Sequence, residues 1–215
     1  SRQTLSETRH PLLKTRGVPA THDIGLALQT IDSLLAGAEV AIPRFDKAAD
    51  EPLASELWER ADTPVEVLVL EGWCLGASAQ PLAALQQPVN ALEQIEDPQG
   101  LWRAYVNETL DKDYQVLFAR VQRWVMLRAP SFDCVAHWRL EQEQKLGEAL
   151  KKAGAGAAEP QRLMDADAID RFVQHYQRLT EYMLQEMPTR VHHLYQLDRQ
   201  RQITEYSTPL NCPSA

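Results

Sequence analysis

The chain has 215 residues, of which 44% are apolar, and a net charge of −8. This length suits one large domain, and the acidic balance argues against a general nucleic-acid or anionic-membrane binder. There is no run of 18 apolar residues, no signal-peptide pattern, and no CxxC spacing among the three cysteines. We therefore predict a cytoplasmic protein with reduced thiols and neither a nucleic-acid nor a membrane partner. No pattern in the sequence predicts an oligomeric state.

The first part of the chain alternates polar stretches with short regular segments. Residues 1–23 are polar and predict a loop, with Asp23 as the candidate N-cap of a helix over 24–35. A short strand is expected at 40–42. The charged stretch that follows is irregular, with a possible short helix around 54–60.

A run of apolar residues marks the centre of the chain. Residues 65–70 predict a strand that is buried on both faces. A long segment with three prolines, residues 73–100, leads into a helix over 102–120, whose apolar positions have helical spacing. A second buried strand is expected at 124–127.

The last part is mostly helical. A long charged helix is expected over 132–152, and a small-residue segment over 153–160 separates it from a helix over about 166–185. Residues 192–197 predict a last strand, and the tail after Ile203 is expected to be loose. Because strands alternate with helices, we predict an α/β fold with a parallel sheet.

The segment from His10 to Asp23 reads HPLLKTRGVPATHD and is dense in special residues. Gly17 indicates an unusual backbone conformation, and Asp23 suits a helix cap. Arg16 and His22 put polar groups on this turn. Each of them is either a substrate contact or an ordinary surface residue.

A mixture of charges follows the short strand at 40–42, in the segment Pro43-Arg-Phe-Asp-Lys47. Arg44 and Lys47 could bind the carboxylate of a small hydroxylated anion, and Asp46 could accept hydrogen bonds from its hydroxyls. The alternative is a solvated loop with an internal ion pair.

Glu71 directly follows the predicted strand 65–70. Open α/β sheets bind ligands at the C-terminal ends of their strands, so a carboxylate there could hold Mg²⁺ or its water near a phosphate. The alternative role is to cap the N-terminus of a nearby helix.

Arg139 lies on the predicted long helix. An arginine on a mobile helix could close over a transferring phosphoryl group and stabilise its charge. The alternative is a solvated helix face on which Arg139 pairs with Glu143 at i, i+4. His192 and His193 are adjacent, so on a strand they would point to opposite faces, and we predict no zinc site there.

Taken in order, these segments resemble one family. The pattern HPLLxTRGVPxTHD, then PRFDK, then an apolar strand ending in EGWCLG, then PxNxLE, WRxxQE and MPTR, is similar to the D-glycerate kinase-like P-loop kinases. The same framework resembles pantothenate and uridine kinases more loosely. The resemblance extends from about residue 9 to residue 203.

The resemblance implies a three-layer P-loop NTPase fold, with a parallel sheet flanked by helices, as a single domain over 1–215 with a lid-like helical segment at about 132–160. It implies ATP-dependent phosphorylation of a small hydroxylated acceptor, favouring a glycerate-like hydroxy acid, with ATP and Mg²⁺ as cofactors. It assigns roles to individual residues: Glu71 near the metal and the phosphates, Arg139 as a lid arginine, Arg16, His22, Arg44, Asp46 and Lys47 at the acceptor pocket, and Arg190 toward the adenine.

The chain departs from the family pattern at two points. It contains no GxxxxGK[ST] phosphate loop, and Asp50-Glu51-Pro52 stands where the family usually has Asp-Arg. We therefore expect the chain to be the larger part of a longer protein whose N-terminal strand and phosphate loop precede Ser1, and to be unable to turn over ATP by itself. The alternatives are a non-catalytic remnant or regulatory binding module of the same fold, and a P-loop hydrolase with a different acceptor.

Overall fold

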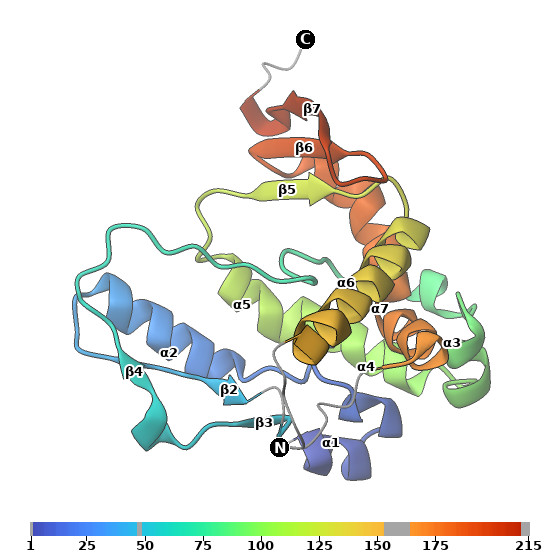
Figure 1. Ribbon diagram of the computed structural model, residues 1–215, viewed down its shortest axis with the longest axis horizontal. Coiled ribbons are helices and arrows are strands. Elements are labelled where there is room, and N and C mark those ends of the chain that lie inside the picture. Colours follow the sequence, from blue (N-terminus) through green and yellow to red (C-terminus); the bar gives the residue numbers. More distant parts are fainter. Residues whose placement is uncertain (1, 47–48, 153–163, 212–215) are drawn as a thin grey trace. The chain divides into compact units, whose positions relative to one another are not determined.

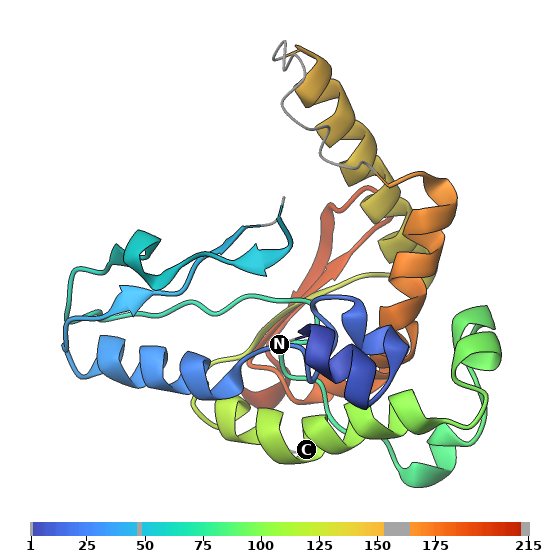
Figure 2. The same ribbon diagram turned by 90° about the horizontal axis from the view of Figure 1, so that it is seen from below.

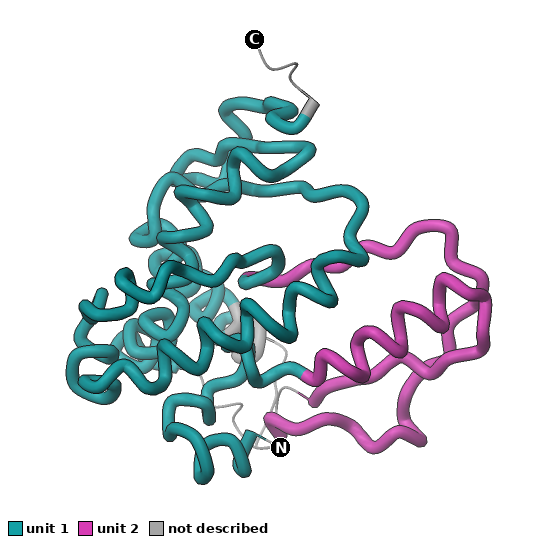
Figure 3. The backbone as a smooth tube through the Cα atoms, turned by 180° about the vertical axis from the view of Figure 1, so that it is seen from behind, with its two compact units in different colours: residues 1–22, 74–215 teal, residues 23–73 magenta. Residues whose placement is uncertain are grey.

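The computed structural model describes residues 2–46, 49–152 and 164–211. The chain divides into two compact units, and Figure 3 shows them in different colours. Unit 1 comprises residues 1–22 and 74–215, and unit 2 comprises residues 23–73. Each unit is described below by itself.

Unit 2 begins with helix α2 (Ile24–Leu35), as the sequence predicts. Asp23 is its N-cap, because Oδ1 of this residue accepts a hydrogen bond from the Leu26 N–H at 2.9 Å. Gly37 follows the helix with a φ of +73°, a left-handed conformation that ends helices at low cost.

Two short antiparallel ladders complete the regular structure described in unit 2. Strand β1 (Ala41–Ile42) pairs with β4 (Glu59–Arg60), and β2 (Phe45–Asp46) pairs with β3 (Glu51–Pro52). The predicted strand at 40–42 is therefore present. Only a short 3-10 turn, Ser55–Leu57, forms where a helix over 54–60 was considered.

The prediction of a buried strand over 65–70 is wrong for this structure. The segment has no strand assignment and joins none of the described sheets. Val67 and Val69 are 79% and 81% exposed, and Leu68 and Leu70 on the other face are 39% and 38% exposed. A strand needs a neighbouring strand for its backbone N–H and C=O groups. The described backbone hydrogen bonds give this segment a single contact, from the Val65 N–H to the Leu34 carbonyl at 3.4 Å, and no ladder.

Unit 1 opens with helix α1 (Arg2–Thr8) and the 3-10 turn Pro11–Lys14, so the prediction of a loop over all of 1–23 is wrong for these residues. The predicted helix over 102–120 is built from α4 (Leu101–Thr109), a π-helical turn (Leu110–Tyr114) and α5 (Gln115–Phe118). Helix α3 (Ala91–Glu96) and the 3-10 turn Leu82–Leu85 precede them.

The two longest helices are α6 (Phe132–Lys152) and α7 (Ala166–Glu186), and both were predicted. They pack on one another, and the C-terminal end of α6 projects away from the rest of unit 1 in Figure 2. The segment 153–160, predicted to separate them, lies outside the described residues, as does the end of the proposed lid segment.

The sheet of unit 1 is mixed, which corrects the prediction of a parallel sheet. Strand β5 (Val125–Arg128) pairs in parallel with β6 (His193–Leu197), and β7 (Ile203–Ser207) adds to β6 antiparallel (Figure 1). Strand β7 replaces the loose tail expected after Ile203. A tight turn between β6 and β7 makes this pairing possible, because the Asp198 N–H donates to the Gln202 carbonyl at 2.9 Å.

The interior of unit 1 contains buried charge. Glu93 and Asp97 are 0% and 1% exposed, and Arg103 and Arg178 are also buried. Arg178 donates from Nε and Nη2 to the two oxygens of Glu93 at 2.8 and 2.6 Å. Arg103 donates from Nη1 to Asp97 Oδ2 at 3.3 Å. Bidentate pairing of this kind satisfies a buried carboxylate and fixes its partner's position.

Both arginines also donate to carbonyl groups of the segment before α3. Arg178 donates to the carbonyl groups of Ala84 and Gln87, and Arg103 donates to that of Leu85. Asn90 caps α3, accepting from the Glu93 N–H at 2.9 Å, and its amide donates to the Gln174 carbonyl on α7. The segment Pro88–Glu93, part of the family resemblance, therefore joins α3 to α7.

Removing one member of this network should destabilise unit 1 strongly. Glu93→Gln leaves the Arg178 guanidinium buried without its counter-charge, which typically costs about 3–5 kcal/mol. The exposed pair between Glu96 and Arg171 is the control, since Glu96→Gln should cost less than about 1 kcal/mol. Urea unfolding of the two variants measures the difference, and equal losses would contradict a structural role for Glu93.

Candidate functional site

The loop over residues 15–22 is the best-defined part of the sequence-predicted site. Its buried residues Val18 and Pro19 anchor it in unit 1. Thr21 holds the turn from within, because its hydroxyl accepts from the Gly17 N–H at 3.0 Å and donates to the Val18 carbonyl at 2.7 Å. We call residues 15–22 the GVP loop after its central residues.

Two residues of the GVP loop adopt left-handed conformations. Gly17 has a φ of +84° and Ala20 a φ of +83°. Gly17 tolerates this region, whereas an alanine there is strained. The unusual backbone expected from the sequence is therefore present, and it extends to Ala20.

Two buried tyrosines from distant parts of the chain hold the GVP loop. The Tyr176 hydroxyl on α7 donates to the Arg16 carbonyl. The Tyr114 hydroxyl, at the end of the π-helical turn, accepts from the Ala20 N–H at 3.2 Å. Sequence reasoning missed both tyrosines, because only the fold brings them to the loop.

His22 lies at the end of this loop, and its Nδ1 is 2.6 Å from the Tyr114 hydroxyl. Although the residue is exposed overall, desolvation of the imidazole lowers the pKa of His22 below its ordinary value. The ring is therefore neutral near pH 7.

A second histidine supports the start of the loop. His175 on α7 is buried, with Nδ1 3.0 Å from the Arg171 carbonyl and Nε2 3.0 Å from the Thr15 hydroxyl. A carbonyl only accepts, so Nδ1 carries the proton and the Thr15 hydroxyl donates to Nε2. Burial lowers the pKa of His175, which keeps the ring neutral.

Three arginines act electrostatically on the Tyr176 hydroxyl. Burial raises the pKa of Tyr176, and the nearby positive charges of Arg16, Arg139 and Arg2 oppose that rise. Arg139 also lies over the ring of Phe172, at 5.6 Å, and that ring contacts Tyr176 at 5.2 Å. Arg16 and Arg139, two residues predicted from the sequence, thus both act on the Tyr176 hydroxyl, as does Arg2. We call Arg2, Arg16 and Arg139 the arginine cluster.

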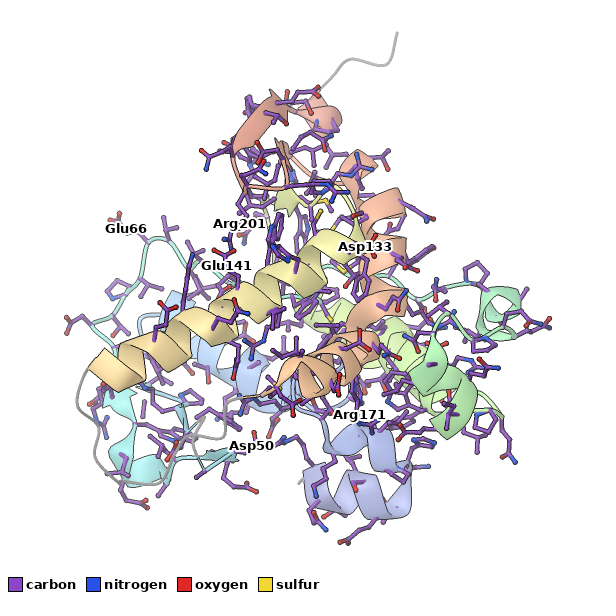
Figure 4. All side chains as sticks on the ribbon, turned by 45° about the vertical axis from the view of Figure 1, so that its right-hand side comes forward. Asp50, Glu66, Asp133, Glu141, Arg171 and Arg201 are labelled. Atoms are coloured by element: carbon purple, nitrogen blue, oxygen red, sulfur yellow. The ribbon has the colours of Figure 1, made fainter. Side chains whose placement is uncertain are left out.

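Arg139 forms the ion pair that was considered as its alternative role. Its Nη1 lies 2.6 Å from Glu143 Oε2, an i, i+4 pair on α6. The same helix is fastened to the β6–β7 turn, where Arg201 pairs with Glu141 (Figure 4) and lies over the Trp138 ring at 5.7 Å. These contacts fix the stretch of α6 that carries Arg139.

Arg190 follows α7 and is held by three groups. It pairs with Glu186 and donates to the Gly76 carbonyl at 3.0 Å and to the Ser78 hydroxyl at 2.8 Å. These contacts fix Arg190 beside the segment that begins unit 1 after residue 73. No described contact joins it to the arginine cluster.

The other predicted site residues belong to unit 2. Arg44 forms an exposed pair with Glu59 at 3.5 Å, and Asp46 accepts from the Ala49 N–H at 3.2 Å. Lys47 lies outside the described residues. Glu71 is exposed and follows the extended segment 65–70. The assignments of these four residues to a site stay predictions.

A buried cysteine and a surface hollow were also considered as parts of the site, and neither belongs to it. Burial raises the pKa of the Cys74 thiol to about 12, so this cysteine stays protonated and is not a nucleophile. A surface hollow of about 260 Å³ is lined by Arg9, Tyr105, Glu108 and Lys112 among others, and contains none of the residues predicted from the sequence.

The described part of the chain offers no group of three or more histidine, cysteine, aspartate or glutamate side chains that could hold a metal ion. Within the same residues, no helix has the length and apolar character needed to cross a membrane.

Comparison with curated proteins confirms the resemblance to kinases of the D-glycerate kinase type. The chain is 29% identical over 194 residues to "Uncharacterized kinase mug58" of Schizosaccharomyces pombe, covering 85% of this chain and 64% of that protein. It is 29% identical over 140 residues to "D-glycerate 3-kinase, chloroplastic" of Arabidopsis thaliana, covering 61% of this chain and 28% of that protein.

A third relative is "Probable ATP-dependent kinase TDA10" of Saccharomyces cerevisiae, 25% identical over 167 residues, with 70% of this chain and 51% of that protein covered. The chain therefore spans between about a quarter and two thirds of the length of these relatives. No family model matches the sequence.

Solved structures show the same fold. The D-glycerate 3-kinase from Cryptococcus neoformans var. grubii superposes with a TM-score of 0.74 at 22% identity, covering 96% of this chain and 74% of that one. The YGR205w protein superposes with a TM-score of 0.66 at 23% identity, covering 96% and 72%. The homologues are kinases, and the α/β fold with its small mixed sheet is similar to glycerate kinase structures.

Gly17→Ala should destabilise unit 1 by about 1–3 kcal/mol. A Cβ at Gly17 would lie 2.9 Å from the Tyr176 hydroxyl, on a backbone with a φ of +84°. The control is Gly25→Ala on α2, where the added Cβ meets only Asp23 Oδ1 at 3.5 Å. Thermal unfolding should show a lower Tm for Gly17→Ala and not for Gly25→Ala. An unchanged Tm in Gly17→Ala would contradict the close approach of Tyr176 to the GVP loop.

The free energy of unfolding should fall as the pH drops below about 6.5, partly through His175. Its folded-state pKa is lowered from the ordinary 6.5, so the unfolded chain takes up the proton first. The stability that neutral His175 contributes is present above the unfolded pKa and is lost as the pH falls through the folded pKa. Histidines usually titrate between about pH 5 and pH 8. Over this range, urea unfolding should show that the free energy of unfolding depends less on pH in His175→Gln than in the wild type. The exposed His137→Gln should match the wild type, and equal slopes in both variants would exclude His175 as a source.

Proposed function

We propose that this chain supplies the acceptor-binding and closing parts of an ATP-dependent small-molecule kinase whose acceptor is a glycerate-like hydroxy acid. The arginine cluster around Tyr176 is the observation that carries the proposal. It combines residues of α1, the GVP loop and α6 in a chain whose net charge is −8, and guanidinium groups suit a carboxylate or a phosphoryl group. The curated relatives are kinases, which supports this class of activity.

Within this proposal, different residues of unit 1 bind different groups of the acceptor. Arg16 binds the carboxylate, and His22, on the same loop, faces a hydroxyl. Arg139 is the closing arginine. Its pair with Glu143 holds the guanidinium over Phe172 until an anion competes for it. Arg190 stays a proposal for the adenine side.

The residues of unit 2 that the resemblance assigns to the same site are proposed separately. Arg44 and Lys47 would add positive charge for the acceptor, and Asp46 would accept from its hydroxyls. Glu71 would bind the metal.

The cofactors fit the described residues to different degrees. Mg²⁺ is commonly held by one or two carboxylates, with phosphates and waters completing the shell, and exposed Glu71 suits such a role. When bound, the ion would neutralise charge on phosphate oxygens. The sequence contains no GxxxxGK[ST] cradle for the phosphates of ATP, so we derive no step at the phosphates from this chain's residues.

A non-catalytic binding module of the same fold is the second candidate, because the arginine cluster and GVP loop could bind a hydroxy acid without transferring phosphate to it. A thermal-shift screen and a phosphorylation assay separate the two. The module would be stabilised by the acid and would form no product when expressed from its complete coding sequence with ATP and Mg²⁺. The kinase would be stabilised by the acid and would also form the phosphorylated product.

In the same assay, Arg16→Gln should raise KM for the acid by about 10- to 100-fold and leave KM for ATP unchanged, because charge-assisted hydrogen bonds are the strong ones. Arg123→Gln is the control, since the hydrogen bond described for that exposed arginine goes to the neighbouring Gln122 carbonyl. Nucleosides or pantothenate turning over better than glycerate would refute the proposed acceptor.

Glu71→Gln should lower kcat by at least about 100-fold without changing Tm, if this carboxylate stabilises charge through the metal. Glu66, labelled in Figure 4, is an exposed carboxylate of the same extended segment, and Glu66→Gln should have wild-type kinetics. Wild-type turnover by Glu71→Gln would remove Glu71 from the mechanism.

A further inference from the structure

We infer that Tyr114 is a positioning residue for His22, holding its imidazole in the tautomer that carries the proton on Nε2. His22 then presents an N–H donor to the acceptor, and it binds the acceptor without acting as a base. The inference rests on the proposed function for the identity of the acceptor, whereas the tautomer itself follows from contacts within unit 1.

The two side chains are in direct contact. The Tyr114 hydroxyl oxygen lies 2.6 Å from His22 Nδ1, and the rings meet edge to face at a centroid distance of 5.9 Å. Such a short O–H···N distance leaves room for one proton between the atoms, so one of them donates and the other accepts.

The surroundings of the hydroxyl decide which atom donates. The phenol oxygen already accepts from the Ala20 N–H at 3.2 Å. Its own hydrogen therefore points to the described acceptor that remains, His22 Nδ1. A neutral imidazole that accepts at Nδ1 carries its proton on Nε2.

Tyr114 stays a donor because it is buried and fixed. Burial raises the pKa of Tyr114, so the hydroxyl keeps its proton. The residue ends the π-helical turn Leu110–Tyr114, and its ring packs edge to face on Phe118 at 5.9 Å. Single π-turns inside helices are frequent at functional sites, because they redirect a side chain without breaking the helix.

The GVP loop supplies the other half of the arrangement. Ala20 has a φ of +83°, which turns its N–H toward the phenol oxygen. His22 follows two residues later, so the loop conformation and the tautomer are set by one hydroxyl group. The second tyrosine of the loop, Tyr176, binds the Arg16 carbonyl and has no described contact with His22.

The test compares Tyr114→Phe with Tyr176→Phe, two variants that each remove one buried hydroxyl from the same loop. Nitrogen-15 NMR of the histidine side chains reports the tautomer, and His22→Gln identifies the His22 signals among the six histidines. We expect an unprotonated Nδ1 in the wild type and in Tyr176→Phe, and a mixture of tautomers in Tyr114→Phe. A protonated Nδ1 in the wild type would overturn the inference, even if Tyr114→Phe failed to fold.

Kinetics on the protein expressed from its complete coding sequence test the role of the donor. Tyr114→Phe should raise KM for the hydroxy acid roughly tenfold, with KM for ATP unchanged, since one positioned hydrogen bond is lost. His22→Gln keeps an N–H donor and should retain more activity than His22→Ala, whereas a base would be lost in both. Equal losses in these two variants, or an unchanged KM in Tyr114→Phe, would overturn the inference. A wild type without kinase activity would refute the proposed function and leave the NMR result on the tautomer standing.

Discussion

The buried pairing of Arg178 with Glu93 is the interaction on which unit 1 depends. It joins α7 to α3 and, through the remaining guanidinium donors, to the turn at Ala84 and Gln87. A buried carboxylate without this partner would be costly, so the network specifies one arrangement of these helices. The contacts of α7 with the proposed site depend on this position of the helix.

Helix α7 carries the groups that shape the site. Phe172 supports Arg139, His175 binds Thr15, and Tyr176 binds the Arg16 carbonyl. These three side chains lie within two turns of Arg178 on the same helix. The stability of the core and the geometry of the arginine cluster are therefore coupled. Helix α7 holds the backbone of the GVP loop at Arg16 through Tyr176, and its Phe172 ring lies beneath the Arg139 guanidinium of α6.

Local signals in the sequence predicted the helices well. Helix α2 has both its N-cap at Asp23 and its apolar period within a dozen residues, and α7 has the same combination. The strands were harder, because a strand depends on a neighbour distant in sequence. Residues 65–70 have the composition of a buried strand and stay unpaired, whereas β7 pairs with β6 through a turn that periodicity does not reveal.

The candidate site likewise has features that the sequence predicts and contacts that only the fold creates. Gly17 and the polar residues around it were visible in the sequence as an unusual turn. Tyr114 is 92 positions from His22 in the chain, and no local pattern announces their contact. The segment Pro88–Glu93 shows the converse: its residues are part of the family resemblance, and in this structure they cap α3 and bind α7.

Calorimetric titration with D-glycerate and with glycerol, its uncharged analogue, tests the central claim most directly. If the arginine cluster binds the carboxylate of a small hydroxy acid, D-glycerate should bind to the chain and glycerol should not. The affinity for glycerate should fall in Arg16→Gln and persist in Arg123→Gln. Equal heats for the two ligands, or glycerate binding that survives the loss of Arg16, would contradict the account.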